Sequence, residues 1–120
     1  MNNKPRYSLF KNAMYSFEGL VYAIKMETSF KLELFFGFFS LVGIIFIQVD
    51  LSYKLILLIT LFLVFIVELL NSAIENVVDL VTKEIHPLAK SAKDVAAAGV
   101  LFALVLHVIC WFFILINLII

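Results

Sequence analysis

The sequence predicts an all-α membrane protein, a single domain over residues 1–120, in which an amphipathic surface helix precedes three transmembrane helices. Composition is the first reason. Of the 120 residues, 64% are hydrophobic and 15% are charged, against about 45–50% and about 25% in soluble domains. So small a domain cannot bury that much apolar surface in water. Distribution is the second reason, because the apolar residues form three long runs that contain few charges.

Residues 1–31 predict the surface helix. Apolar residues recur between Leu9 and Ile24 at a spacing close to the helical period. Five of the nine basic residues lie in this segment, and they are Lys4, Arg6, Lys11, Lys25 and Lys31. A helix with one basic and one apolar side is typical of a membrane surface. No long apolar core or small-residue cleavage site follows the basic start, so the segment does not resemble a signal peptide.

The three apolar runs predict transmembrane helices at about 32–48, 54–81 and 92–118. A spanning helix needs about 20 apolar residues. The third run is long enough alone, whereas the second reaches full length only by including Glu68 and Asn71. Charged groups inside a span are expensive, so Glu68 is a functional candidate.

The segment 82–94 connects the last two predicted spans. Pro87 breaks helical continuity there, and Asp94 suits the N-cap of the third span. The loop between the first two spans carries one basic residue, Lys54, and the other eight lie in this segment or before the first span. By the positive-inside rule, the N-terminus and the 82–94 loop are cytoplasmic.

Several classes of function are disfavoured by composition. The formal net charge is zero, so nothing indicates a nucleic-acid partner. The single cysteine, Cys110, excludes an intramolecular disulfide and a cysteine-based metal cluster. We interpret Cys110 and His107 as packing residues of the third span. The sequence contains no glycine-rich phosphate loop and no nucleophile elbow.

The second span carries a polar stripe formed by Glu68, Asn71, Glu75 and Asp79. Steps of three and four residues place these side chains on one face of a helix. Like charges four residues apart repel, so a cation or a basic partner is expected nearby. Oxygen ligands without cysteine suit magnesium, which binds one or two carboxylates together with substrate phosphates. The alternative is structural, since polar residues inside membranes also join helices through hydrogen bonds and lysine contacts.

Two further carboxylates, Glu27 and Glu33, lie just before the first span. Glu33 is equally well explained as part of a solvated charge cluster. Any nucleotide would have to be held by carboxylate-bound metal, lysines and helix ends. Such a set is sufficient for phosphoryl transfer, which depends on positioning and charge neutralisation.

The run Glu68-Leu69-Leu70-Asn71-Ser72-Ala73-Ile74-Glu75-Asn76-Val77-Val78-Asp79 resembles the signature of the small integral-membrane diacylglycerol kinases of bacteria and their undecaprenol kinase relatives. A second block, Ala92-Lys93-Asp94-Val95-Ala96-Ala97-Ala98, resembles the family's other motif. Two positions depart from the pattern: Ser8 stands where the family has an arginine, and Ala97 where it has a small hydroxyl residue.

The resemblance implies a homotrimer in the bacterial inner membrane that uses ATP to phosphorylate diacylglycerol to phosphatidic acid at the cytoplasmic interface. It implies Glu68 as general base, and Glu27 and Glu75 as carboxylates that hold Mg²⁺ with ATP. The implied ATP-binding residues are Tyr15, Glu27, Glu75, Glu84, Ile85, His86, Lys93 and Asp94. The other polar residues placed at the active site are Asn71, Glu33 and Asp79.

Other functions stay open at this stage. Tyr15, Ser16, Gly19 and Leu20 are similar to the diacylglycerol kinase branch, whereas the run from His86 to Lys90 is closer to the undecaprenol kinase branch. Diacylglycerol is the favoured substrate, and undecaprenol is the alternative. A small ion-coupled transporter would also use intramembrane carboxylates, but it usually shows internal repeats or broken helices. A non-catalytic assembly subunit would need packing motifs alone.

Overall fold

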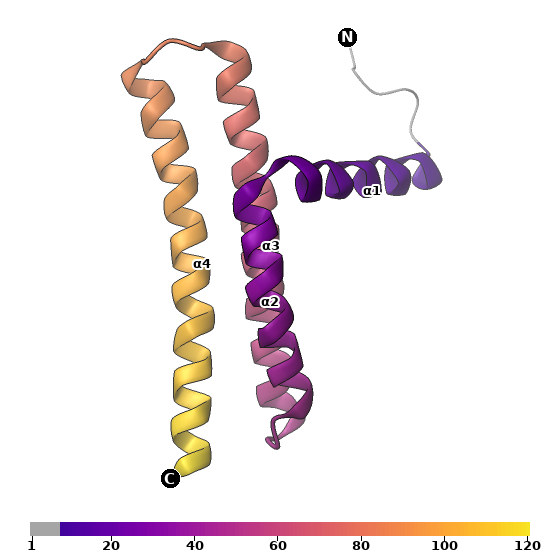
Figure 1. Cartoon of the computed structure of the whole chain (residues 1–120), viewed down its shortest axis with the longest axis vertical. Helices are drawn as coiled ribbons and strands as arrows, with labels where there is room; N and C mark the ends of the chain where they lie inside the picture. Colours follow the sequence, from indigo (N-terminus) through magenta and orange to yellow (C-terminus); the bar gives the residue numbers. More distant parts are fainter. Residues whose placement is uncertain (1–7) are drawn as a thin grey trace.

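The computed structural model describes residues 8–120, which form four α-helices and no strand. The helices are α1 (Leu9–Met26), α2 (Thr28–Phe46), α3 (Leu51–Val81) and α4 (Pro87–Ile119). The long helices α2, α3 and α4 run alongside one another, and α1 projects across them from one end (Figure 1). The predicted all-α class is therefore confirmed over the described residues.

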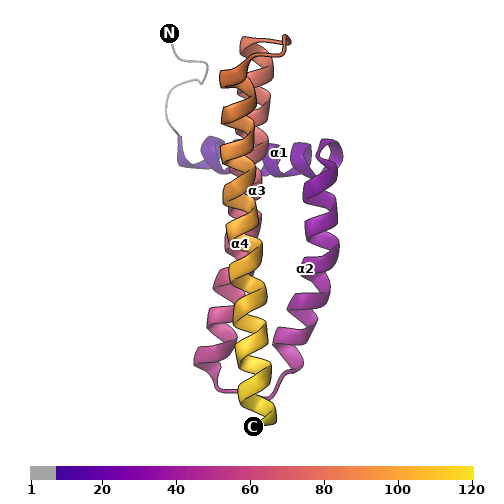
Figure 2. The same cartoon turned by 90° about the vertical axis from the view of Figure 1, so that its left-hand side faces the viewer.

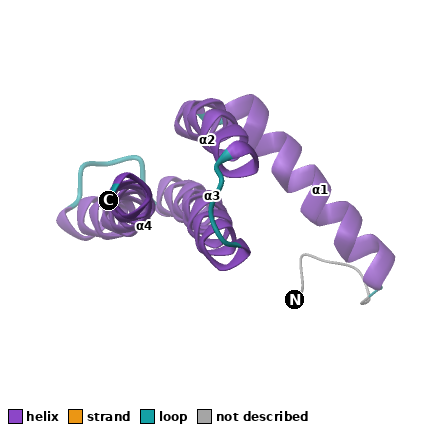
Figure 3. Ribbon diagram, turned by 90° about the horizontal axis from the view of Figure 1, so that it is seen from below, coloured by secondary structure: helices purple, strands orange, loops and turns teal. Residues whose placement is uncertain are grey.

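Helix α3 is the centre of the bundle. It packs against both α2 and α4, and the view along the helices places it between them (Figure 3). The α3–α4 loop lies beyond α1 at one end of the molecule, and the α2–α3 loop and the C-terminus lie at the other (Figure 2). Helix α3 therefore presents side chains to both outer helices.

Among residues 8–120, three helices are long and apolar enough to cross a membrane, and they are α2, α3 and α4. Their outer faces are apolar and exposed, as in Phe36 (66% exposed) and Phe102 (77%). With 31 residues, α3 is about 46 Å long at about 1.5 Å per residue. A hydrocarbon core is about 30 Å thick, so part of α3 extends beyond it.

The helix boundaries differ from the expected spans at the N-terminal ends. Helix α2 begins at Thr28 rather than 32, α3 at Leu51 rather than 54, and α4 at Pro87 rather than 92. Helix α1 ends at Met26 rather than 31, because Glu27 adopts an extended conformation that caps both neighbouring helices. The predicted surface helix also includes Lys4 and Arg6, which lie outside the described residues.

The prediction that Asp94 caps the third span is wrong. Helix α3 ends at Val81, and α4 begins at Pro87, with His86 as its N-cap. The His86 ring accepts a hydrogen bond from the backbone N–H of Leu88 at 3.1 Å. Proline suits the first helical position because its missing N–H would have no helical partner there. Pro87 therefore starts α4, and Asp94 lies inside it.

The apolar core lies toward the end of the bundle away from α1. Its buried residues are Ile44 from α2, Leu57 and Leu61 from α3, and Ile114 from α4. At Gly37, a Cβ atom would come within 2.5 Å of the Phe65 ring. A side chain at that position would push α2 away from α3, so glycine permits their close approach.

Candidate active site

Polar side chains gather on α3 in the half of the bundle nearer to α1 and the α3–α4 loop. Glu68 (3% exposed) and Asn71 (7%) are buried, whereas Glu75 and Asp79 are half-buried. The stripe expected from spacing therefore runs from a buried end to a partly exposed end. A reactant from the membrane and one from the cytoplasm could approach opposite ends of this stripe.

The buried end is completed by α2. Glu33 places its carboxyl group next to that of Glu68, so it is not part of a freely solvated charge cluster. One oxygen of Glu33, Oε2, and the amide oxygen of Asn71 are buried without a hydrogen-bond partner among residues 8–120. Most buried polar groups are paired in native proteins. These two oxygens beside Glu68 are therefore available to accept hydrogen bonds.

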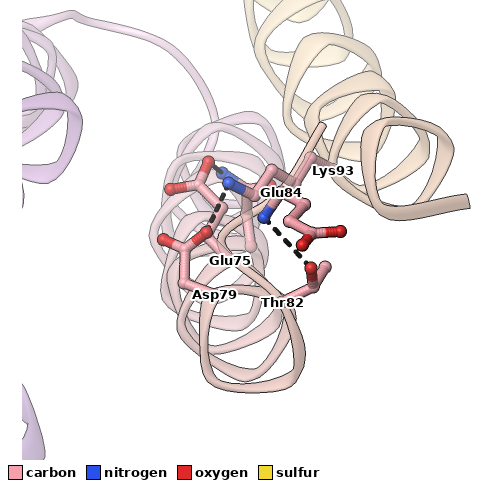
Figure 4. Close-up of polar contacts among 6 residues, drawn as sticks. Glu75, Asp79, Thr82, Glu84 and Lys93 are labelled. Carbon is pink, nitrogen blue, oxygen red and sulfur yellow. Dashed lines mark hydrogen bonds and ion pairs between the residues drawn. The ribbon is translucent and has the colours of Figure 1, made fainter. Parts of the chain in front are cut away.

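The exposed end is joined to α4. The Lys93 ammonium group donates to Asp79 Oδ1 at 2.7 Å (Figure 4), and the Asn71 amide donates to Glu75 Oε1 at 3.2 Å. Lys93 therefore supplies the basic partner that the Glu75–Asp79 pair requires. The Asp79 carboxylate therefore joins α3 to α4 through Lys93, as expected if polar residues of the stripe connect helices.

The predicted nucleotide contacts on α4 and its loop are more exposed. Asp94 forms an ion pair with Lys90 one turn earlier on α4. Glu84 and Ile85 are exposed in the loop, where the backbone N–H of Glu84 donates to Thr82 Oγ1 at 3.1 Å (Figure 4). His86 lines a cavity of about 370 Å³ between the end of α3 and the start of α4.

Glu27 approaches α3 from the α1–α2 junction. It lines a cavity of about 330 Å³ whose walls come from α1 and from α3, including Ser72 and Asn76. The negative charges of Glu27 and Glu75 both lie close enough to repel the Glu68 carboxylate. Tyr15 is half-buried on α1 and does not line this cavity. The structure therefore brings Glu27 close to Glu68 on α3.

The carboxylates here are too few for a permanent metal cage within the described residues, and their oxygens are the ligand type that suits magnesium. Among residues 8–120, no group of three or more His, Cys, Asp or Glu side chains is arranged to hold a metal ion. The donors available are the carboxylates of Glu27 and Glu75. Magnesium is commonly bound by one or two carboxylates, with waters and substrate phosphates completing its shell.

The two departures from the family pattern have ordinary structural surroundings. Ser8 is the N-cap of α1, and its hydroxyl oxygen accepts a hydrogen bond from the backbone N–H of Lys11 at 3.5 Å. Ala97 is exposed on α4. Ala97 offers no polar group, and Ser8 offers a hydroxyl group in place of the positive charge of an arginine.

A second polar cluster was missed in the sequence, where His107 was interpreted as a packing residue. His107 is buried on α4 and contacts the hydroxyl groups of Ser40 on α2 and Thr60 on α3. The available signal was weak: Ser40 and Thr60 are isolated hydroxyl residues within apolar runs. Nothing in their spacing indicates that they meet.

Comparison with known proteins gives a consistent result. Residues 14–115 match the family described as prokaryotic diacylglycerol kinase. Diacylglycerol kinase from Escherichia coli (strain K12) is 40% identical over 103 residues, which cover 86% of this chain and 84% of that protein. The diacylglycerol kinase of Helicobacter pylori (strain ATCC 700392 / 26695) is 38% identical over 86% of this chain and 80% of its own length. That of Haemophilus influenzae is 40% identical, with coverages of 86% and 87%.

Proposed function

This chain belongs to the prokaryotic diacylglycerol kinase family and is a lipid kinase of the membrane, and from that premise we propose how and where it acts. The reaction is ATP-dependent phosphorylation of diacylglycerol to phosphatidic acid, at the cytoplasmic face of the bacterial inner membrane. The observation that carries the proposal is the polar stripe of α3, which runs from buried Glu68 to half-exposed Asp79. The lipid hydroxyl group would bind at the buried end of this stripe, and the nucleotide phosphates would bind at the exposed end.

Glu68 is the proposed general base. It lies seven residues before Glu75, about 10 Å along the helix at about 1.5 Å per residue, and deeper among apolar side chains. The Glu68 carboxylate takes the proton of the primary hydroxyl while that oxygen bonds to the γ-phosphorus. The bond from this phosphorus to the bridging oxygen breaks, and ADP leaves with the electron pair. Glu33 and Asn71 lie beside Glu68 and fix the position of its carboxylate.

The nucleotide is bound toward the exposed end. Glu27 and Glu75 would hold Mg²⁺, which neutralises phosphate charge when bound. Lys93 contacts the phosphates, and Asp79 orients Lys93 through the ion pair between them. The remaining contacts proposed for ATP come from Tyr15, Glu84, Ile85, His86 and Asp94.

The proposed placement in the membrane follows from how the elements are distributed. Helix α1 and the 82–86 loop lie toward one end of the bundle (Figure 1), and both carry basic residues that favour the cytoplasmic side. Leu9, Phe10 and Phe17 of α1 are 76%, 77% and 65% exposed, which suits a helix on the lipid surface. The exposed apolar faces of α2 to α4 suit lipid contact and assembly into the proposed homotrimer.

Turnover in a defined membrane tests the proposal. Purified protein in vesicles is supplied with ATP and either diacylglycerol, undecaprenol or neither, with and without magnesium. We expect magnesium-dependent ADP release and phosphatidic acid with diacylglycerol. Faster turnover of undecaprenol would reassign the substrate. No turnover of either lipid, together with proton-coupled flux across the vesicle membrane, would replace the kinase with a transporter.

A further inference from the structure

The second polar cluster joins all three long helices. His107 Nε2 lies 2.7 Å from Ser40 Oγ on α2, and His107 Nδ1 lies 2.7 Å from Thr60 Oγ1 on α3. Trp111, one turn after His107 on α4, donates its indole N–H to Ser40 Oγ at 2.9 Å. All these polar atoms have partners, unlike those around Glu68.

The hydrogen atoms available determine the direction of these bonds. The Thr60 hydroxyl group donates to the backbone carbonyl oxygens of Ile56 and Leu57 at 3.0 and 3.1 Å. The Trp111 indole N–H can only donate, so the Ser40 hydrogen has one acceptor among the contacts of residues 8–120, which is His107 Nε2. His107 Nδ1 then carries the proton and donates to Thr60 Oγ1. A neutral imidazole has one donor and one acceptor nitrogen, so Nε2 accepts from the Ser40 hydroxyl group. The chain runs from Trp111 through Ser40 and His107 to Thr60 and the α3 backbone.

The opposite tautomer leaves this chain incomplete. With the proton on Nε2, Ser40 Oγ would receive both the imidazole and the indole N–H groups. The Ser40 hydrogen would then have no acceptor among the contacts of residues 8–120, and Thr60 would have to donate to Nδ1 instead of to its carbonyls. Unpaired buried donors are costly, so the Nδ1–H form is favoured.

The cluster also bears on the position of α2. Ser40 follows Glu33 by seven residues, about 10 Å along α2 at about 1.5 Å per residue. Both residues and His107 line one cavity of about 320 Å³ between the three helices. Phe30, three residues from both Glu27 and Glu33, packs edge to face on Phe65 of α3 and anchors the first turns of α2. The Glu33 side chain contacts Glu68, and Oε2 has no hydrogen-bond partner among residues 8–120. Because Ser40 ties α2 to α4 through His107, this contact helps to set where α2 holds Glu33.

We propose that His107, neutral and protonated on Nδ1, is a positioning residue that ties α2 to α3 and α4 and so holds Glu33 beside Glu68. Its effect on turnover rests on the proposed function. The tautomer and the stability of the bundle do not.

Nitrogen-15 NMR of His107 in lipid vesicles tests the hydrogen-bond direction without any activity measurement. Protein labelled on histidine nitrogens contains His86 and His107, and a His86→Gln variant assigns the His107 signals. We expect Nδ1 to carry the proton and Nε2 to have the shift of an unprotonated acceptor. A protonated Nε2, in either the neutral or the charged ring, would overturn the assignment.

Substitutions at Thr60 test the positioning role. Thr60→Val keeps the side-chain shape but removes the acceptor of the Nδ1–H bond, whereas Thr60→Ser keeps the hydroxyl group. We expect Thr60→Val to lower kcat by about 10- to 100-fold, because a misplacement of about 1 Å can have an effect of this size. The KM for ATP should stay within about twofold of the parent value. Thr60→Ser should stay within about twofold of the parent, and Ser52→Ala on the exposed start of α3 is the matched control.

Each outcome decides one claim. Parent-like kcat in Thr60→Val would overturn the positioning role, and so would an equal loss in Thr60→Ser. If Thr60→Val does not fold, Ser40→Ala, which breaks the same tie at α2, takes its place, and a parent-like kcat in that variant would overturn the positioning role. Absence of diacylglycerol turnover in the parent, with the Nδ1–H form observed, would refute the proposed function and leave the tie intact.

Discussion

The two polar clusters of this protein lie in the same bundle and are built in opposite ways. Around Glu68, oxygens of Glu33 and Asn71 are buried without partners among the described residues. Around His107, the ring and both hydroxyl groups are hydrogen-bonded across helices. A fully paired cluster stabilises a structure, whereas unpaired buried oxygens cost free energy unless something binds them. The difference supports the proposal that chemistry takes place at the Glu68 cluster and that the His107 cluster positions it.

Glu68→Gln is the substitution with the largest expected effect on this comparison. Glutamine keeps the size and hydrogen-bonding ability of glutamate but cannot take the hydroxyl proton. General-base assistance is typically worth about 10²–10⁴-fold in rate, so we expect a loss of turnover on that order with folding and ATP binding retained. Glu18→Gln, on the exposed side of α1, is the matched control. Turnover of folded Glu68→Gln within a few-fold of the parent would reject the base role and favour a structural one.

Glu27→Gln and Glu75→Gln should act on magnesium rather than on folding. Each variant removes one anionic oxygen ligand. Half-maximal turnover should therefore require about 10- to 100-fold more magnesium, because even residues that only support metal ligands change metal affinity by about this factor. Titration of activity with magnesium at fixed ATP measures this shift. Full activity of Glu27→Gln at limiting magnesium would contradict a site made by two carboxylates.

Ser40→Ala should weaken the bundle from the side of the paired cluster. It leaves His107 Nε2 and the Trp111 indole N–H without their partner, and an unpaired buried group costs about 1–3 kcal/mol. We expect a lower thermal midpoint in detergent or lipid, while the magnesium requirement stays unchanged. Ser52→Ala should leave the midpoint unaltered. An unchanged midpoint for Ser40→Ala would show that this cluster adds nothing to stability.

Asp79→Asn should have the smallest effect. The side chains of Asp79 and Lys93 are 44% and 40% exposed, and exposed ion pairs contribute little to stability. We expect a near-normal thermal midpoint and a few-fold rise in the KM for ATP, because Lys93 loses the group that orients it. Asp50→Asn at the opposite end of the bundle is the control. A strong loss of stability would show that the α3–α4 contact is mainly structural.

The helices themselves follow from local pattern. Apolar runs and the helical period predict α2, α3 and α4 because side-chain direction repeats with backbone geometry over a few residues. Their ends were less predictable. A proline between two helical patterns can end one helix or begin the next, and Pro87 begins α4. The break at Glu27 depends on how α1 leaves α2, and no glycine or proline marks it in the sequence.

The sequence by itself determined that the protein is helical and apolar enough for a membrane, and that Glu68, Asn71, Glu75 and Asp79 share one helix face. These features depend on residues close together in the chain. Tertiary structure alone decided that Glu33 lies beside Glu68, that Lys93 pairs with Asp79, and that His107 meets hydroxyl groups 67 and 47 residues away. The physical reason is that helix packing sets which faces meet, and packing sums many weak contacts between distant segments.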